Sequence, residues 1–163
     1  MIFTRAAAAD IPALTELRLA YLAEDFGALA DAEAESFRRA LPGYFRENLD
    51  RRLLGYVARE GGAAVACALL LLVDKPMSPA FPNGRTGTVL NVYTRPAWRR
   101  RGCARRLMEM LLADAKERGL CRIELKATAA GAPLYRSLGF TDDGDKYSLL
   151  TWRNPCAETP AHH

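Results

Sequence analysis

The residues with the clearest chemical potential are three consecutive arginines, Arg99–Arg101, followed by Gly102. A basic turn of this kind binds anions when it stands at the start of a helix. The first backbone N–H groups of a helix have no intrahelical acceptor, and the helix dipole is positive at that end. Gly102 lets a ligand approach the backbone without a side chain in the way. The sequence therefore predicts an anion site here, and phosphate is the usual guest of such sites.

The segments on either side of the turn are the ones that such a site requires. Residues 88–94 are rich in β-branched and apolar residues and end before Pro96, which predicts a strand. After the turn, apolar residues share one helical face: Ala104, Leu107, Met108, Leu111, Leu112 and Ala115. The turn is thus expected to join a strand to a helix. The chain has no P-loop string, and the turn has one glycine where a dinucleotide fingerprint needs three.

A second segment, residues 132–140, reads Ala-Pro-Leu-Tyr-Arg-Ser-Leu-Gly-Phe and predicts a short helix closed by Gly139. Together the two segments resemble the GNAT acetyltransferase superfamily. Arg99, Gly102 and Ala104 fill the defined positions of its Gln/Arg-x-x-Gly-x-Gly/Ala signature, and residues 134–140 match its Leu-Tyr-x-x-Leu-Gly-Phe segment. The resemblance covers residues 88–140, about a third of the chain.

The resemblance implies acetyl-CoA as cosubstrate and assigns residues to it. The pantetheine arm would enter between two splayed parallel strands, 88–94 and 121–127, and pair with the backbone of Val92, Tyr93 and Thr94. Thr128 stands where many members have an asparagine that contacts the same arm, and Gly131 stands where alanine is common. The pyrophosphate would rest on the turn that begins at Arg99, on the amides of Arg100, Arg101, Gly102, Cys103, Ala104 and Arg105.

The implied reaction is attack of a primary amine on the thioester carbonyl, with direct transfer in a ternary complex. By resemblance, Tyr135 is the catalytic residue that protonates the leaving thiolate; the alternative is a half-buried tyrosine that closes the helix against the sheet. The amine must be neutral when it attacks, so a base is useful. Glu124, Glu24 and Asp25 are candidates, and a relayed water is an alternative. Asn91 lies nearby but cannot take a proton.

The predicted fold is one α/β (α+β) domain of the acyl-CoA N-acyltransferase type, spanning residues 1–153, with a polar tail at 154–163. Its mixed central sheet would have about six to seven strands, flanking helices and the splayed parallel pair. Helices are predicted from a cap at Asp10 and over 31–52, the latter broken or kinked at Pro42-Gly43. The predicted strands are 2–5, 53–59, 63–73, 88–94, 121–127, one beginning at Phe140, and 146–152.

Composition narrows the class of protein further. The chain has 163 residues and a net charge of +4, and outside the arginine turn its basic residues alternate with acids, so no nucleic-acid partner is expected. Its cysteines, four in number, form no C-x-x-C pair, and its only histidines are His162 and His163, so no metal site is expected. No apolar run reaches the length of a membrane span, and the N-terminus lacks the apolar region of a signal peptide. We therefore expect a cytoplasmic protein with no membrane partner.

Two alternatives to the enzyme stay open. A non-catalytic acyl-CoA sensor on the same fold would lack an acceptor pocket and the role of Tyr135. A basic nucleic-acid-binding module would use Arg99–Arg106 and bind in a salt-sensitive way. The amine acceptor has no signature in the sequence: small amines, amino acids, polyamines, antibiotics and protein termini all fit. A homodimer is also open, because members of this superfamily often dimerise.

Overall fold

The structure is a computed structural model that describes residues 1–144, 146–155 and 157. The predicted polar tail therefore lies largely outside the described residues, as do Cys156, His162 and His163. The boundary predicted at residue 153 stays a prediction.

A single five-stranded sheet forms the centre of the molecule, with its strands in sequence order. Neighbouring strands are antiparallel from β1 to β4, and β4 and β5 are parallel. The strands are β1 (Ile2–Arg5), β2 (Leu53–Glu60), β3 (Ala63–Asp74), β4 (Arg85–Thr94) and β5 (Arg122–Glu124). The predicted mixed α/β domain is confirmed, with five strands in the described residues where six to seven were expected.

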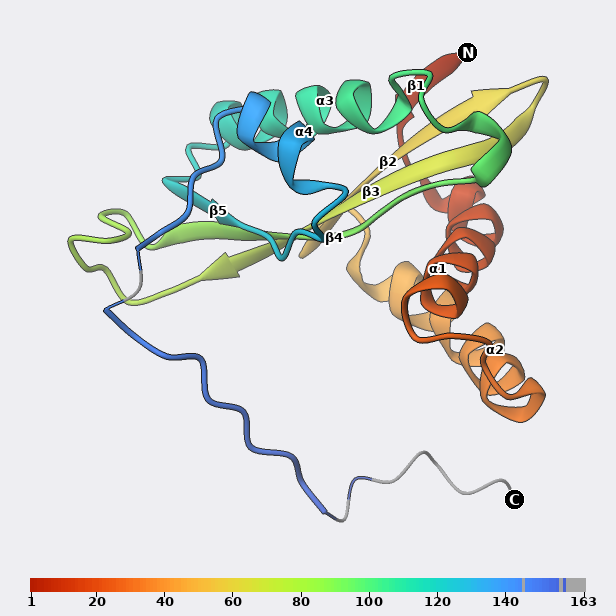
Figure 1. Ribbon diagram of the computed structural model, residues 1–163, viewed down its shortest axis with the longest axis horizontal. Helices are drawn as coiled ribbons and strands as arrows, with labels where there is room; N and C mark the ends of the chain where they lie inside the picture. The colour runs from red at the N-terminus through yellow and green to blue at the C-terminus, as the bar shows by residue number, and fades with distance from the viewer. Residues whose placement is uncertain (145, 156, 158–163) are drawn as a thin grey trace.

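Helices cover both faces of this sheet (Figure 1). α1 (Ile11–Asp25) and α2 (Asp31–Asn48) lie on one face, and α3 (Cys103–Glu117) and α4 (Ala132–Ser137) lie on the other. Each face has its own apolar core. Leu14 and Leu17 of α1 and Phe45 of α2 are buried against one face of the sheet. Leu107 and Leu111 of α3 are buried against the other face. The sheet thus separates two layers of helices, and residues of the two layers can line one site only where the sheet has a gap.

The predicted β-α-β unit is present: β4 leads through α3 to β5, and the two strands are parallel. Gly119, with φ of +70°, ends α3, as the predicted helix stop requires. The strand predicted over 121–127 was too long, because β5 covers Arg122–Glu124 alone. β4 and β5 pair at three positions only, and after Glu124 the chain leaves the sheet.

The two strands predicted at the C-terminus are absent from the described residues. Neither Phe140 nor residues 146–152 lie in a strand, and the segment after α4 runs away from the sheet (Figure 1). Its apolar side chains therefore have no core to fill, and Tyr147, Leu149, Leu150 and Trp152 are 77–89% exposed. Residues 146–152 were predicted to form a last strand, but in the structure they pair with no described strand.

Two helix predictions were wrong in detail. α2 runs through Pro42 without a break and ends at Asn48. Asp10 precedes α1 but does not cap it: one carboxylate oxygen accepts the N–H of Ala7 at 2.7 Å and the other pairs with Arg59. Arg59 lies on β2, so its ion pair with Asp10 ties the start of α1 to the sheet.

Candidate functional site

A gap opens between β4 and β5 where their pairing ends. The strands pair from Thr86↔Arg122 to Thr88↔Glu124, and beyond Thr88 the edge of β4 has no partner strand in the described part of the chain. A cleft of about 1430 Å³ occupies this gap. Residues of β4, β5 and the segment after it line the cleft, together with α1 from one face of the sheet and α4 from the other. The cleft therefore joins the two layers that the sheet otherwise separates.

A bulge in β4 lies at the widening of this gap. Cys67 pairs with Tyr93 and Leu69 pairs with Leu90, so two β4 residues, Asn91 and Val92, lie opposite Ala68. Asn91 takes a left-handed conformation with φ of +54°, which asparagine adopts more readily than most residues. Bulges of this kind bend a strand and redirect its side chains, and they are frequent next to active sites.

The side chain of Asn91 is buried, and both its oxygen and its nitrogen are hydrogen-bonded. Its Oδ1 accepts a hydrogen bond from Nη1 of Arg18 at 3.2 Å, and its Nδ2 donates to Sγ of Cys67 at 3.2 Å. Asn91, which the sequence excluded as a base, thus holds an arginine of α1 against the cleft.

We expect Asn91→Ala to be less stable than Asn91→Gly by about 0.5–1 kcal/mol in urea unfolding. Both variants lose the side-chain hydrogen bonds, but only glycine adopts a positive φ without strain, and its greater freedom in the unfolded chain offsets part of the difference. A glycine variant no more stable than the alanine variant would show that the left-handed backbone is not what this position demands.

The arginine turn has the geometry that its sequence predicts. Arg100 and Gly102 have φ of +62° and +79°, and α3 begins at Cys103, directly after them. The first hydrogen bond of the helix runs from the N–H of Arg106 to the carbonyl of Gly102. No backbone carbonyl of the described residues accepts the N–H groups that precede it in the turn, those of Arg101, Gly102, Ala104 and Arg105. These donors and the dipole of a 15-residue helix form an anion site.

The arginine side chains have different partners. Arg99 ties the turn to its surroundings: it donates to the carbonyl of Thr94 at 2.9 Å and pairs with Glu24 of α1 at 2.5 Å. Arg101 stacks over the ring of Trp98 at 4.8 Å, and Arg105 donates to Oγ of Ser137 on α4 at 2.7 Å. The charges of Arg99 and Arg105 are thus used in part to position the turn, which leaves the backbone amides as its main ligand donors.

Tyr135 lies on α4, and its side chain lines the cleft. Its ring packs edge-on against Phe140 with centroids 6.0 Å apart, and its hydroxyl donates to no acceptor among the described residues. Burial raises the pKa of Tyr135, and Tyr21 on α1 raises it further. The hydroxyl therefore keeps its proton well into the alkaline range, as a proton donor must.

Gly131 and Thr128 fix the position of Tyr135. Thr128 Oγ1 accepts the N–H of Gly131 at 3.1 Å, so this hydroxyl serves the start of α4. A Cβ on Gly131 would lie 3.2 Å from Cε2 of Tyr135 and 3.3 Å from Oγ1 of Thr128. Glycine at this position lets the tyrosine ring lie closer than alanine would.

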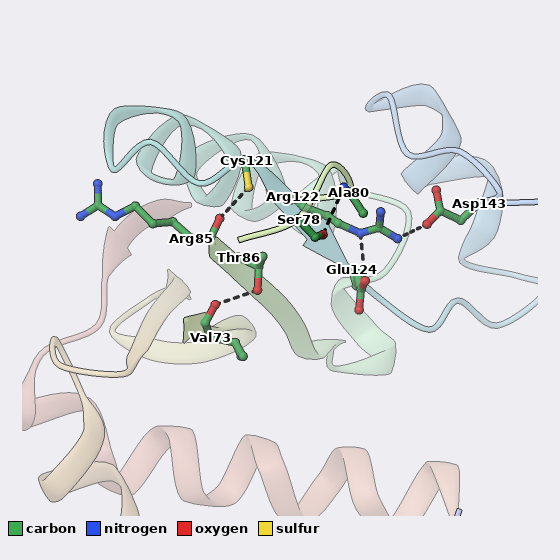
Figure 2. Close-up of polar contacts among 9 residues, drawn as sticks. All are labelled: Val73, Ser78, Ala80, Arg85, Thr86, Cys121, Arg122, Glu124 and Asp143. Carbon is green, nitrogen blue, oxygen red and sulfur yellow. Dashed lines mark hydrogen bonds and ion pairs between the residues drawn. The ribbon is translucent and has the colours of Figure 1, made fainter. Parts of the chain in front are cut away.

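The three candidate bases differ in whether they line the cleft and in whether their carboxylates are already paired. Glu24 is paired with Arg99 and does not line the cleft. Glu124 lines it but accepts from Nε of Arg122 at 3.0 Å, and Figure 2 shows Arg122 between Glu124 and Asp143, to which it also donates. Asp25 lines the cleft from α1 with the hydroxyl of Tyr21 3.5 Å away.

Figure 2 also shows how the closed end of the cleft is held. Thr86 of β4 donates to the carbonyl of Val73 on β3 at 2.7 Å, and Cys121 donates to the carbonyl of Arg85 at 3.3 Å. These bonds join β5 to β4 and β4 to β3 where the strands are still paired. The gap opens only beyond this point.

Sequence reasoning missed Arg18, which lines the cleft from α1 together with Tyr21. Tyr21 lies only partly in the core, and its ring is 5.7 Å from the guanidinium of Arg18. The spacing of Arg18, Tyr21 and Asp25 at i, i+3 and i+7 places them on one helix face, which was the available signal. Arg18 and Asp25 are charged residues on a helix face whose other residues are mostly buried. This indicates that part of the face borders a cleft rather than the apolar core.

Other kinds of site are not seen among the described residues. They contain no group of three or more histidine, cysteine or acidic side chains placed to hold a metal ion. None of the helices in this part of the chain combines the length and apolar character needed to cross a membrane.

Comparison with solved structures defines the class. The chain is 30% identical to a predicted acetyltransferase of Clostridium acetobutylicum solved with acetyl-CoA, over 92% of this chain and 95% of that one, with a TM-score of 0.79. A GCN5-related N-acetyltransferase of Ralstonia eutropha JMP134 is 28% identical over 91% and 97%, with a TM-score of 0.73. An aminoglycoside N-acetyltransferase in complex with CoA shares the fold at 13% identity over 95% and 100% (TM-score 0.66). The fold is that of acetyltransferases.

The family follows from the sequence itself. The model of the acetyltransferase (GNAT) family matches residues 13–140, which span α1 through the Tyr135 segment. The chain therefore belongs to the GNAT acetyltransferase family. A search of the curated proteins found no match.

Proposed function

We propose that this protein is an N-acetyltransferase that moves the acetyl group of acetyl-CoA to a primary amine by direct transfer in a ternary complex. One observation carries the proposal: the cleft in the split sheet runs past an unpaired edge of β4 and has Tyr135 on its wall. The anion site at the start of α3 directly follows the same strand.

The cofactor assignment follows from these two features. A pantetheine arm carries amide groups and can pair with the unpaired edge of β4 at Val92, Tyr93 and Thr94, as an added strand would. The pyrophosphate can accept hydrogen bonds from the amides of the turn after Arg99. We propose that Arg100–Arg105 bind it and that the hydroxyl of Thr128, which retains its own proton as a donor, contacts the arm.

The chemistry needs one proton to leave the amine and one to reach the sulfur. The amine nitrogen attacks the thioester carbonyl, the carbon–sulfur bond breaks, and the thiolate takes a proton, so that amine and acetyl-CoA give amide and CoA thiol. Tyr135 is the proposed donor because its hydroxyl lies in the cleft, stays protonated and is not engaged by a described residue. A general acid of this kind contributes about 10²- to 10⁴-fold.

Direct transfer is favoured because the described cysteines are poor nucleophiles for the thioester. Cys67 is fully buried, and burial raises its pKa to about 12. Cys103 is buried under α3, and its pKa is also raised by burial. Cys121 lines the cleft at its closed end, where its thiol donates to the Arg85 carbonyl.

An amine panel tests the proposal. Acetyl-CoA is incubated with the protein and with small amines, amino acids, polyamines, aminoglycosides and peptides, and released CoA thiol is measured against the protein alone. Acetyl-CoA binding without thiol release from any amine would favour the sensor. Salt-sensitive DNA binding that free CoA does not displace would favour the nucleic-acid module.

Initial-rate kinetics test direct transfer. Double-reciprocal plots of rate against acetyl-CoA at several amine concentrations should give intersecting lines, in the wild type and in Cys121→Ala.

We expect Gly131→Ala to lower kcat about tenfold while changing the melting temperature little. Gly131 has α-helical φ and ψ of −84° and −26°, so alanine costs no backbone strain at this position before the first residue of α4. Its Cβ, however, displaces the ring of Tyr135 by a few tenths of an ångström, and misplacement by 1 Å can cost about 100-fold. Steady-state kinetics with thermal unfolding checks both; an unchanged kcat would show that the ring position is not limiting.

A further inference from the structure

Arg18 differs from the other arginines of the cleft in its partners. Arg122 pairs with Glu124 and Asp143, and Arg136 pairs with Asp142. Arg18 forms no ion pair within the described part of the chain; its one hydrogen bond goes to the neutral amide of Asn91. A half-buried guanidinium without an anion is costly, because its charge is only partly hydrated.

The place of Arg18 is the acceptor side of the cleft. The helix start that would bind pyrophosphate lies with α4 on one face of the sheet, and α1 lies on the other face (Figure 1). Tyr21, one turn after Arg18, nonetheless lines the same cleft as Tyr135, and it raises the pKa of Tyr135. Arg18 therefore lies one helical turn from Tyr21, in the cleft that also holds Tyr135.

The neighbours of Arg18 leave its charge available. Nη1 is engaged by Asn91, which leaves the other N–H donors of the fork. Asp25, the acid on the same helix face, is seven residues further on, about 10 Å along the axis, and lies beside the Tyr21 hydroxyl instead. Lys116 and Lys126 also line the cleft without an ion pair among the described residues, but both are exposed; Lys126 comes from the opposite wall.

We propose that Arg18 binds the carboxylate of the acceptor, so that the substrate class is free amino acids acetylated on their amine. This inference rests on the proposed function. A guanidinium fork matches a carboxylate with two parallel hydrogen bonds, and a half-buried site with no competing acid strengthens them. Asn91 holds Arg18 from the bulge of β4, so the recognition is fixed relative to the strand that would hold pantetheine.

The same charge discriminates against other acceptors. Polyamines and aminoglycosides carry several positive charges and no carboxylate, so they would meet Arg18 with repulsion and leave it unpaired. For a bound amino acid, the nearby cation favours the neutral form of the amine, which is the form that attacks. Arg18 is therefore a specificity-determining residue for the reaction.

The test compares each amino acid with its carboxamide and with the amine that lacks the carboxyl group: leucine with leucinamide and 3-methylbutylamine, and phenylalanine with its two counterparts. We expect kcat/KM for the better amino acid to exceed that of its carboxamide by at least about tenfold, the range of a charged hydrogen bond. The carboxamide has the less basic amine, so amine ionisation works against this preference. Arg18→Gln should bring the ratio near one, and Arg18→Lys should retain part of it.

Lys126→Gln is the matched control, because it removes a cation from the opposite wall. A preference that Lys126→Gln abolishes and Arg18→Gln retains would overturn the inference, as would equal acetylation of acid and carboxamide by the wild type. Acetyl-CoA affinity and melting temperature of each variant show that the fold and the cofactor site are intact.

A second readout separates the inference from the proposed function. If no amine releases thiol although acetyl-CoA binds, the proposed function fails. Calorimetric titration of the CoA complex with N-acetyl-leucine and with N-acetyl-leucinamide then decides the inference alone. Tighter binding of the acid to the wild type, lost in Arg18→Gln, would support a carboxylate site, and equal or absent binding of the two would overturn it.

Discussion

Replacing Gly102 with glutamate is expected to lower the affinity for acetyl-CoA by at least about 100-fold. A glutamate here puts a negative charge at the amides that would bind pyrophosphate. Two like charges about 4 Å apart near a protein surface repel by up to about 4 kcal/mol, and tenfold in affinity is about 1.4 kcal/mol. A Cβ at Gly102 meets no atom within 4 Å, so the side chain enters open space in the anion site rather than the core. The fold should survive the substitution.

Gly102→Gln is the matched control because it has the same shape without the charge. Both variants suffer strain at a φ of +79°, about 1–2 kcal/mol, and both should melt at a lower temperature than the wild type, the glutamate variant somewhat less so because the helix start favours negative charge. Calorimetry with acetyl-CoA should then give a loss for glutamate at least about tenfold larger than that for glutamine. Equal affinities for the two variants would remove pyrophosphate from this turn, and unchanged affinity in Gly102→Glu would overturn the cofactor assignment.

The elements of this fold that could be predicted are those whose patterns are local. The period of the apolar residues after Ala104 predicted α3, and Arg99, Gly102 and Ala104 predicted a strand-to-helix turn, which the structure contains. The structure adds that Arg99 is tied to Glu24, which lies 75 residues away in sequence. Contacts of such separation depend on how layers pack and leave no spacing in the sequence.

The side of the cleft formed by α1 and the bulge of β4 shows the same limit of prediction from sequence even more clearly. Arg18 and Asn91 meet across 73 residues, and they meet because a single extra residue bulges β4. In the run 88–94, Asn91 is the only residue that adopts a left-handed backbone with ease, which is a local signal for the bulge, but nothing in this run points to Arg18 as its partner. The prediction of a strand over residues 146–152 failed for a related reason: a strand depends on backbone pairing with a distant strand, and local residue types do not specify that partner.

Replacing Tyr135 with phenylalanine is expected to lower kcat by about 100-fold or more and to change acetyl-CoA affinity by less than about twofold. The ring contact with Phe140 and the packing against Gly131 are kept, so α4 stays in place. Only the hydroxyl is lost, and with it the proton for the thiolate, an effect of the size that general acids contribute. Pre-steady-state acetyl transfer and calorimetry on the same preparation separate the two quantities.

The pH profile distinguishes this role from a structural one. Because burial and Tyr21 raise the pKa of Tyr135, the wild type keeps its acid protonated above the range in which a tyrosine ordinarily ionises, and its activity should rise with pH while the acceptor amine loses its proton. Activity should fall only above the raised pKa, where the tyrosine ionises. In Tyr135→Phe the rise should persist at a lower level and this alkaline fall should vanish. A variant with unchanged kcat would assign the proton to water, and a profile that keeps the alkaline fall would assign it to another group of the cleft.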